Sequence, residues 1–127
     1  APAPFGIADA DQRLGPEDLL MLSEKPVIRM IRTREIRVVE SQGNYTLFYL
    51  AGDKTVLMNR PLHHWEDRLP EDLFLKASRS LLVNAELISR IVKITRNEYD
   101  LSFNGLLKPI PVGRLAMQRI REKMPRL

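Results

Sequence analysis

The chain of 127 residues contains no cysteine, which excludes disulfide bonds, thiol catalysis and cysteine-ligated zinc. Its two histidines are adjacent, at positions 63 and 64. Successive side chains on a helix point about 100° apart, so the pair is poorly placed to hold one metal ion. The apolar runs are no longer than a strand, as in Leu81-Leu82-Val83. A membrane-spanning helix is therefore not expected, and we expect a cytoplasmic domain without membrane contact, metal or other cofactor.

Catalytic motifs are also missing. The six glycines form neither a phosphate-binding loop nor a dinucleotide fingerprint. No serine lies in a recognisable nucleophile elbow. We therefore expect that the chain is not an enzyme.

Positive charge is concentrated in one part of the chain. Residues 1–24 hold one of the 20 lysines and arginines but five of the 16 acidic residues, which leaves 19 bases against 11 acids in residues 25–127. Such a field attracts polyanions, and nucleic acid is one class of partner that it favours.

Composition predicts one folded domain preceded by a linker. Residues 1–16 are rich in Ala, Pro and Asp and show no sustained hydrophobic period, which is typical of a linker or of a remnant left by cloning. Residues 17–127 suffice for one domain. A linker at the start suggests that a sensor or receiver domain precedes this one in a longer protein.

Short strand-like runs dominate residues 17–127, and turn residues end each of them. Tyr99, Leu101 and Phe103 alternate with polar residues, which is the period of a half-buried strand. Asn104-Gly105 is a hairpin signal, because a type I′ turn needs positive φ at both positions. Pro109 and Pro111 push the last strand to a sheet edge. The predicted strands are 19–22, 27–31, 36–39, 45–50, 55–58, 88–94, 99–103 and 110–112.

Only two segments have helical spacing. Pro61 suits a first helical position, and Leu62, Trp65 and Leu69 follow at helical intervals until the next proline. Residues 115–124 form the second predicted helix, with Leu115, Met117 and Ile120 on its apolar face. A helix-turn-helix needs adjacent helices, so any DNA contact must come from strands or loops.

Three segments stand out by their order and spacing. They are Val39-Glu40-Ser41-Gln42-Gly43-Asn44-Tyr45, Phe74-Leu75-Lys76-Ala77-Ser78-Arg79-Ser80-Leu81-Leu82-Val83-Asn84 and Ile110-Pro111-Val112-Gly113-Arg114. Together they resemble the LytTR family of bacterial DNA-binding domains. Asn59-Arg60-Pro61-Leu62, with Leu69-Pro70, resembles the segment that the family has between the first two. The resemblance extends from about Glu17 to Met124.

This resemblance implies a mainly β fold: elongated, antiparallel and built of several small sheets, with a short internal helix and a C-terminal helix. Family members are transcription regulators, often joined to a receiver domain in two-component systems. They place loops in successive major grooves of duplex DNA at direct repeats, so pairs of protomers on the DNA are expected. Carried over residue by residue, the DNA-binding set is Gln42, Asn44, Tyr45, Lys76, Ser78, Arg79, Ser80 and Arg114.

Side-chain chemistry suggests roles for this set. Arg79 and Arg114 each offer a planar fork for guanine O6 and N7, whereas Lys76, Ser78 and Ser80 suit phosphate contacts. Two roles stay open for Asn44, which either pairs with adenine or only holds the Gly43-Asn44 turn. Two also stay open for Tyr45: contact with DNA, or packing within the sheet. Weaker phosphate candidates are Arg60, Lys93 and Lys108, and Asn84 is expected to satisfy backbone groups instead.

Some positions depart from the family pattern. Ser78 stands where the family usually has histidine, and Lys76 where it usually has arginine. Gly113 replaces a serine, and Pro61 also departs from the pattern. Lysine attracts phosphate but lacks the bidentate geometry of arginine. The departures put the target sequence in question more than DNA binding itself.

Two other functions compete with duplex DNA binding. A protein-interaction module could use its basic loops to recruit an acidic partner. An RNA-binding sheet would stack bases on exposed strand aromatics, but Phe48, Tyr49, Tyr99 and Phe103 are few, and several are expected to face the core.

Overall fold

The structure is a computed structural model that describes residues 13–124. It is mainly β, as predicted. The strands are β1 Leu19–Glu24, β2 Val27–Arg32, β3 Val38–Gln42, β4 Tyr45–Leu50, β5 Lys54–Met58, β6 Phe74–Ser78, β7 Leu81–Asn84, β8 Ile88–Lys93, β9 Glu98–Phe103 and β10 Ile110–Gly113. The helices are α1 Leu62–Glu66 and α2 Arg114–Lys123, with three short 3₁₀ turns, η1 Thr33–Glu35, η2 Ala51–Asp53 and η3 Ala85–Leu87.

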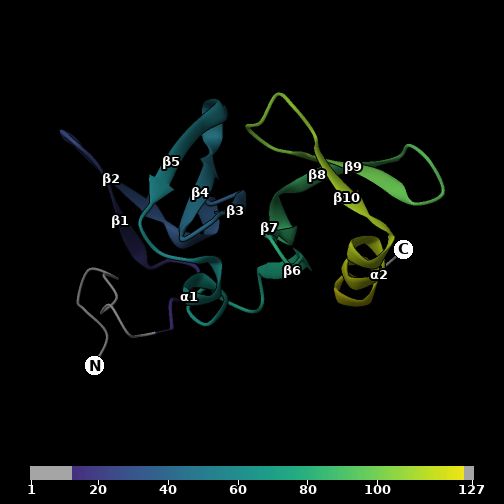
Figure 1. The fold of residues 1–127 in the computed structure, drawn as a ribbon, viewed down its shortest axis with the longest axis horizontal. Helices are drawn as coiled ribbons and strands as arrows, with labels where there is room; N and C mark the ends of the chain where they lie inside the picture. Colours follow the sequence, from purple (N-terminus) through teal and green to yellow (C-terminus); the bar gives the residue numbers. More distant parts are fainter. Residues whose placement is uncertain (1–12, 125–127) are drawn as a thin grey trace.

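All strand pairs are antiparallel, and they form three sheets. β1 and β2 form a hairpin, the central sheet has the order β5-β4-β3-β7-β6, and the third has the order β10-β9-β8. The β1–β2 hairpin lies at one end of an elongated molecule, and the three-stranded sheet and α2 lie at the other (Figure 1). The predicted elongated fold of several small sheets is confirmed, with β10 at a sheet edge as its prolines require.

The central sheet is buried on both faces. Neighbouring residues of a strand point to opposite faces, and Val38 and Val39 accordingly belong to different hydrophobic clusters. Val39 joins Phe48, Trp65 and other residues beneath the β1–β2 hairpin and α1. The opposite cluster packs the sheet against the three-stranded sheet and α2 and contains Val38, Val83, Tyr99, Leu101, Phe103, Met117 and Ile120.

The two helices are far apart in the chain, so no helix-turn-helix is present in residues 13–124. α1 is shorter than predicted, and Pro61 is its N-cap rather than its first residue. α2 packs on β6, β9 and β10 and buries Met117 and Ile120, as predicted. Leu115, predicted on the same apolar face, is instead 68% exposed, because Ala116 occupies the buried position beside Met117. No helix in residues 13–124 is long and apolar enough to span a membrane.

The connection between β9 and β10 differs from the predicted tight turn. The strands pair antiparallel, but residues 104–109 separate them. Gly105 has a positive φ of 89°, whereas Asn104 does not have a positive φ, so a type I′ turn is excluded. The Gly105 carbonyl instead accepts hydrogen bonds from the backbone N–H groups of Gly52 (2.8 Å) and Asp53 (3.3 Å). This connection therefore joins the three-stranded sheet to the β4–β5 turn.

The packed chain begins upstream of residue 17. Leu14 is 2% exposed within the first hydrophobic cluster, and its N–H donates to the carbonyl of Arg68 at 2.6 Å. Residues 1–12 of the predicted linker lie outside the described residues, so their assignment as a linker stays a prediction.

Candidate nucleic-acid interface

The first candidate loop is the turn between β3 and β4. Gln42 pairs with Tyr45 across a two-residue loop, and Gly43 has a φ of 66°. This is the loop position at which type II′ hairpins favour glycine. The left-handed conformation thus falls on Gly43 and not on Asn44. Gln42, Asn44 and Tyr45 are all exposed, so their side chains are accessible to a ligand.

The second candidate loop is the turn between β6 and β7, in which Ser78 pairs with Leu81 around Arg79 and Ser80. The N–H of Ser80 donates to Ser78 Oγ at 3.3 Å. The N–H of Ser41, on β3, donates to the carbonyl of Ser80 at 2.8 Å. This hydrogen bond holds the two turns side by side at one end of the central sheet, which we call the loop end.

The third candidate loop is the junction of β10 and α2. Gly113 is the N-cap of α2 and Arg114 is its first residue, and both are exposed. A shallow hollow of about 330 Å³ separates this junction from the second loop, and its walls include Ser78, Pro111 and Gly113. The third loop therefore also lies next to the loop end.

Lys76 connects the second loop to both helices. A β-bulge separates Lys76 from Ser78. Lys76 Nζ lies 3.1 Å from Glu66 Oε1, next to α1, and the Lys76 carbonyl accepts a hydrogen bond from Arg119 of α2 at 2.9 Å. The Lys76 side chain is 48% exposed and that of Glu66 27%, and ion pairs that water reaches contribute little to stability. The ammonium group therefore stays available to a phosphate.

The weaker phosphate candidates separate into two groups. Thr46, next to Tyr45, donates through Oγ1 to the Arg60 carbonyl at 3.2 Å, which places Arg60 beside the first loop. Lys93 pairs with Tyr99, which in turn pairs with Val112, just before the third loop. Lys108 lies in the β9–β10 connection, which contacts the β4–β5 turn at the opposite end of β4. Ten of the eleven candidates thus gather around the loop end, and Lys108 does not.

Arg96 also belongs to this region, although it was not among the predicted residues. Arg96 is exposed in the β8–β9 turn, and the Asn97 carbonyl in that turn lies 3.9 Å from where a Cβ on Gly113 would be. The detectable signal was the spacing of Arg90, Lys93 and Arg96, which adds positive charge toward this turn. Arg96, Arg79 and Arg114 form none of the ion pairs found in residues 13–124.

Two other polar residues near the motifs are structural. Asn84 is fully buried, as expected for a backbone-satisfying role: Nδ2 donates to the carbonyls of Arg34 (2.8 Å) and Ile36 (2.9 Å), and Oδ1 accepts from the Glu86 N–H. Tyr49 donates its hydroxyl to Glu40 at 3.1 Å. Burial, the negative charge of Glu40 and this hydrogen bond together raise the pKa of Tyr49.

Comparison with known proteins identifies the family. The family model described as the LytTr DNA-binding domain matches residues 27–125, which include all three loops. The chain belongs to the LytTR family. A solved LytTr domain, from a Bacillus cereus protein described as a methyl-accepting/DNA response regulator, superposes with a TM-score of 0.70. It is 21% identical, and the match covers 83% of this chain and 94% of that domain. No curated protein matches the chain.

Proposed function

We propose that this LytTR domain binds double-stranded DNA sequence-specifically by placing its three loops in the major groove. The observation that carries the proposal is the convergence of the loops: the Ser41–Ser80 backbone hydrogen bond joins the first two, and the third lies across a shallow hollow from the second. Exposed, unpaired guanidinium groups at Arg79 and Arg114 suit guanine edges. The cations around them suit phosphates.

We further propose that the domain is the cytoplasmic output domain of a bacterial transcription regulator, acting after a receiver or sensor domain. On direct repeats it would act as a pair of protomers. Each protomer presents a single set of loops at its loop end, so a second copy is needed to contact a second repeat.

The placement of the aromatic side chains argues against an RNA-stacking platform. Phe48, Tyr99 and Phe103 are between 0% and 6% exposed. Base stacking on a sheet requires exposed aromatic faces, so these three rings are not accessible to bases.

Selection from a random pool of duplex DNA, followed by sequencing at two salt concentrations, tests the proposal. We expect enrichment of a repeated motif and affinity that falls steeply as salt rises, because bound cations displace counterions from the phosphates. Salt-sensitive binding without enrichment would contradict sequence specificity. Absence of binding at both concentrations would contradict DNA binding and favour a protein-interaction module.

A further inference from the structure

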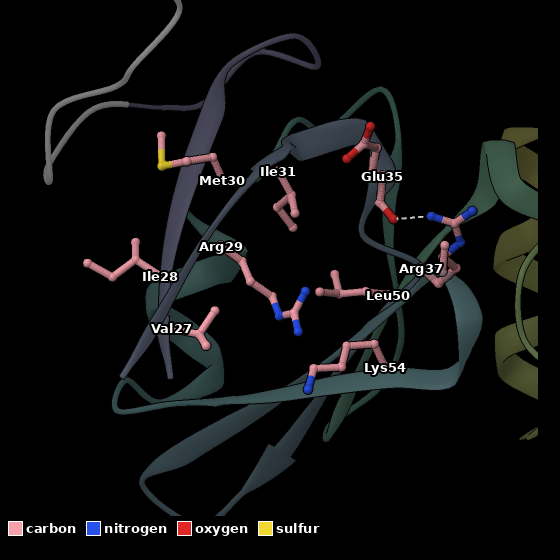
Figure 2. Close-up of a pocket in the computed structure, with 10 residues that line it drawn as sticks. Val27, Ile28, Arg29, Met30, Ile31, Glu35, Arg37, Leu50 and Lys54 are labelled. Carbon is pink, nitrogen blue, oxygen red and sulfur yellow. Dashed lines mark hydrogen bonds between the residues drawn. The ribbon is translucent and has the colours of Figure 1, made fainter. Parts of the chain in front are cut away.

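A second hollow lies away from the loops, between β2 and the β4–β5 turn, with a volume of about 550 Å³. Its apolar walls include Val27, Ile31 and Leu50. Figure 2 shows Val27, Arg29 and Ile31 pointing from β2 toward this space, whereas Ile28 and Met30 point away from it. Leu50 and Lys54 are at the far end of β4 and β5 from Tyr45 and Met58, so the hollow is separate from the loop end.

Arg29 is unusual among the residues that line this space. It faces inward from a strand position flanked by apolar residues, and its Nε atom is buried without a hydrogen-bond partner among the described residues. It also belongs to none of the ion pairs formed within residues 13–124. A buried N–H without a hydrogen-bond partner is unfavourable and is rare in native proteins. The Arg29 Nε–H is therefore free to donate a hydrogen bond to a bound ligand.

The other two cations of the hollow have polar partners. Lys54 Nζ lies 3.1 Å from Glu24 Oε1. Arg37 donates to the carbonyls of Asn104 and Glu35 (the second bond is drawn in Figure 2). Burial lowers the pKa of Arg37, while the negative charge of Glu35 opposes that shift. Arg29 is therefore the one cation lining the hollow whose side chain forms no hydrogen bond or ion pair within residues 13–124.

We propose that this hollow binds an organic monoanion, with its carboxylate on the Arg29 guanidinium and an aliphatic body against Val27, Ile31 and Leu50. A guanidinium offers Nε–H and a terminal N–H in a fork that matches the two oxygens of a carboxylate. The hollow combines apolar side chains with four charged residues, Arg29, Glu35, Arg37 and Lys54, and its volume is within the range of small-molecule sites. This function goes beyond DNA binding and does not depend on it.

Titration with octanoate, followed by NMR of the backbone amides and of the Arg29 Nε–H signal, tests the proposal. We expect saturable shifts centred on Arg29 and the β4–β5 turn. Neutral octanamide lacks the charge and acetate lacks the aliphatic body, so each should bind at least tenfold more weakly. Each methylene removed from the chain should weaken binding about fourfold. Absence of shifts near Arg29, or equal binding of octanamide, would overturn the proposal.

Substitution of Arg29 provides a second, independent test of the proposed site. Arg29→Leu should weaken octanoate binding at least tenfold, because it removes the guanidinium group that is proposed to hold the carboxylate. Arg90→Leu is the matched control: it removes an exposed arginine from β8, in the third sheet, and should leave octanoate binding unchanged. Equal binding by the parent and by Arg29→Leu would overturn the proposal. If the spectrum of Arg29→Leu shows misfolding, Arg29→Gln takes its place with the same expected result.

Discussion

Individual side chains at the loop end differ in what they can recognise. Arginine presents a rigid fork of donors, which distinguishes guanine from the other bases, whereas lysine is a point charge that any phosphate satisfies. Arg79 and Arg114 are therefore proposed to set sequence preference. Lys76, whose nearest anion is Glu66 at 3.1 Å, is proposed to set the strength of binding to any duplex.

At this scale we expect Arg79→Ala and Arg114→Ala each to weaken binding to the preferred site by ~1–3 kcal/mol and to relax preference at one base position. Lys76→Ala should weaken binding to all sequences alike. It should also lower the salt slope, which is the slope of log affinity against log salt concentration, by about one. Fluorescence anisotropy on preferred and scrambled duplexes at several salt concentrations measures both effects.

Lys108→Ala is the matched control for this series, because the same residue type lies at the opposite end of β4. It should leave both the affinity and the salt slope nearly unchanged. A loss with Lys108→Ala as large as with Lys76→Ala would show that the loop end is not the binding surface. Retention of full base preference by both arginine variants would show that other residues recognise the bases.

Among the secondary-structure elements, the β9–β10 connection determines how two sheets meet. Gly105 lies so close to the β4–β5 turn that a Cβ there would be 3.1 Å from Ala51 Cα. Its φ of 89° is also unfavourable for other residues. Gly52, on the other side of this contact, has a φ of 76°, but a Cβ there would meet nothing within 4 Å.

We expect Gly105→Ala to lower the free energy of unfolding by more than Gly52→Ala. Both substitutions introduce backbone strain of about 1–2 kcal/mol, and only Gly105→Ala adds a clash with backbone. Urea unfolding measures the difference as a shift in midpoint at constant slope. Equal midpoints for the two variants would mean that the backbone around Ala51 moves to accommodate the new Cβ without loss of stability.

The same elements show how much of the secondary structure could be predicted from the sequence alone. Residues 45–50 were predicted with the observed bounds, because turn residues flank both ends of β4. The prediction of a tight turn at Asn104-Gly105 was wrong. The conformation of Gly105 is set by its hydrogen bonds to residues 51–53, which are more than 50 positions away in the chain. Local sequence carries no information on such a contact.

The candidate site was predictable to a similar extent. Motif order supplied the three loops, but only pairing of β3 with β7 brings Ser41 to Ser80 and joins two of them. Arg96 lay outside every motif, and its position beside the third loop depends on how β9 pairs with β10. For the same reason Lys108 was grouped with the others: charge and exposure do not reveal which end of a sheet a residue occupies.

For the molecule as a whole, the shape limits how much DNA one copy can contact. All three loops lie at or next to the loop end, so one copy carries a single set of them. On direct repeats, we expect two copies to bind cooperatively only when both lie on the same side of the duplex.

Changing the distance between the repeats tests this expectation. Inserting about 5 base pairs rotates one repeat to the opposite side of the helix, whereas about 10 base pairs restores its orientation. Affinity for the paired site should fall with the first insertion and recover with the second, as measured by gel shift. A steady decline with distance, without recovery, would contradict the same-side arrangement, and no change at all would mean that the copies bind independently.

The hydrogen bond from Ser41 to Ser80 also has a consequence for the DNA. It makes the separation of the first two loops a property of the sheet, so the loops cannot move apart to suit each target. In the proposed binding mode, the duplex would then supply the adjustment, by bending or by a change in groove width. Deformation of this kind depends on base steps and is easiest at flexible pyrimidine–purine steps. Some base pairs that the protein never touches would therefore influence affinity through their stiffness.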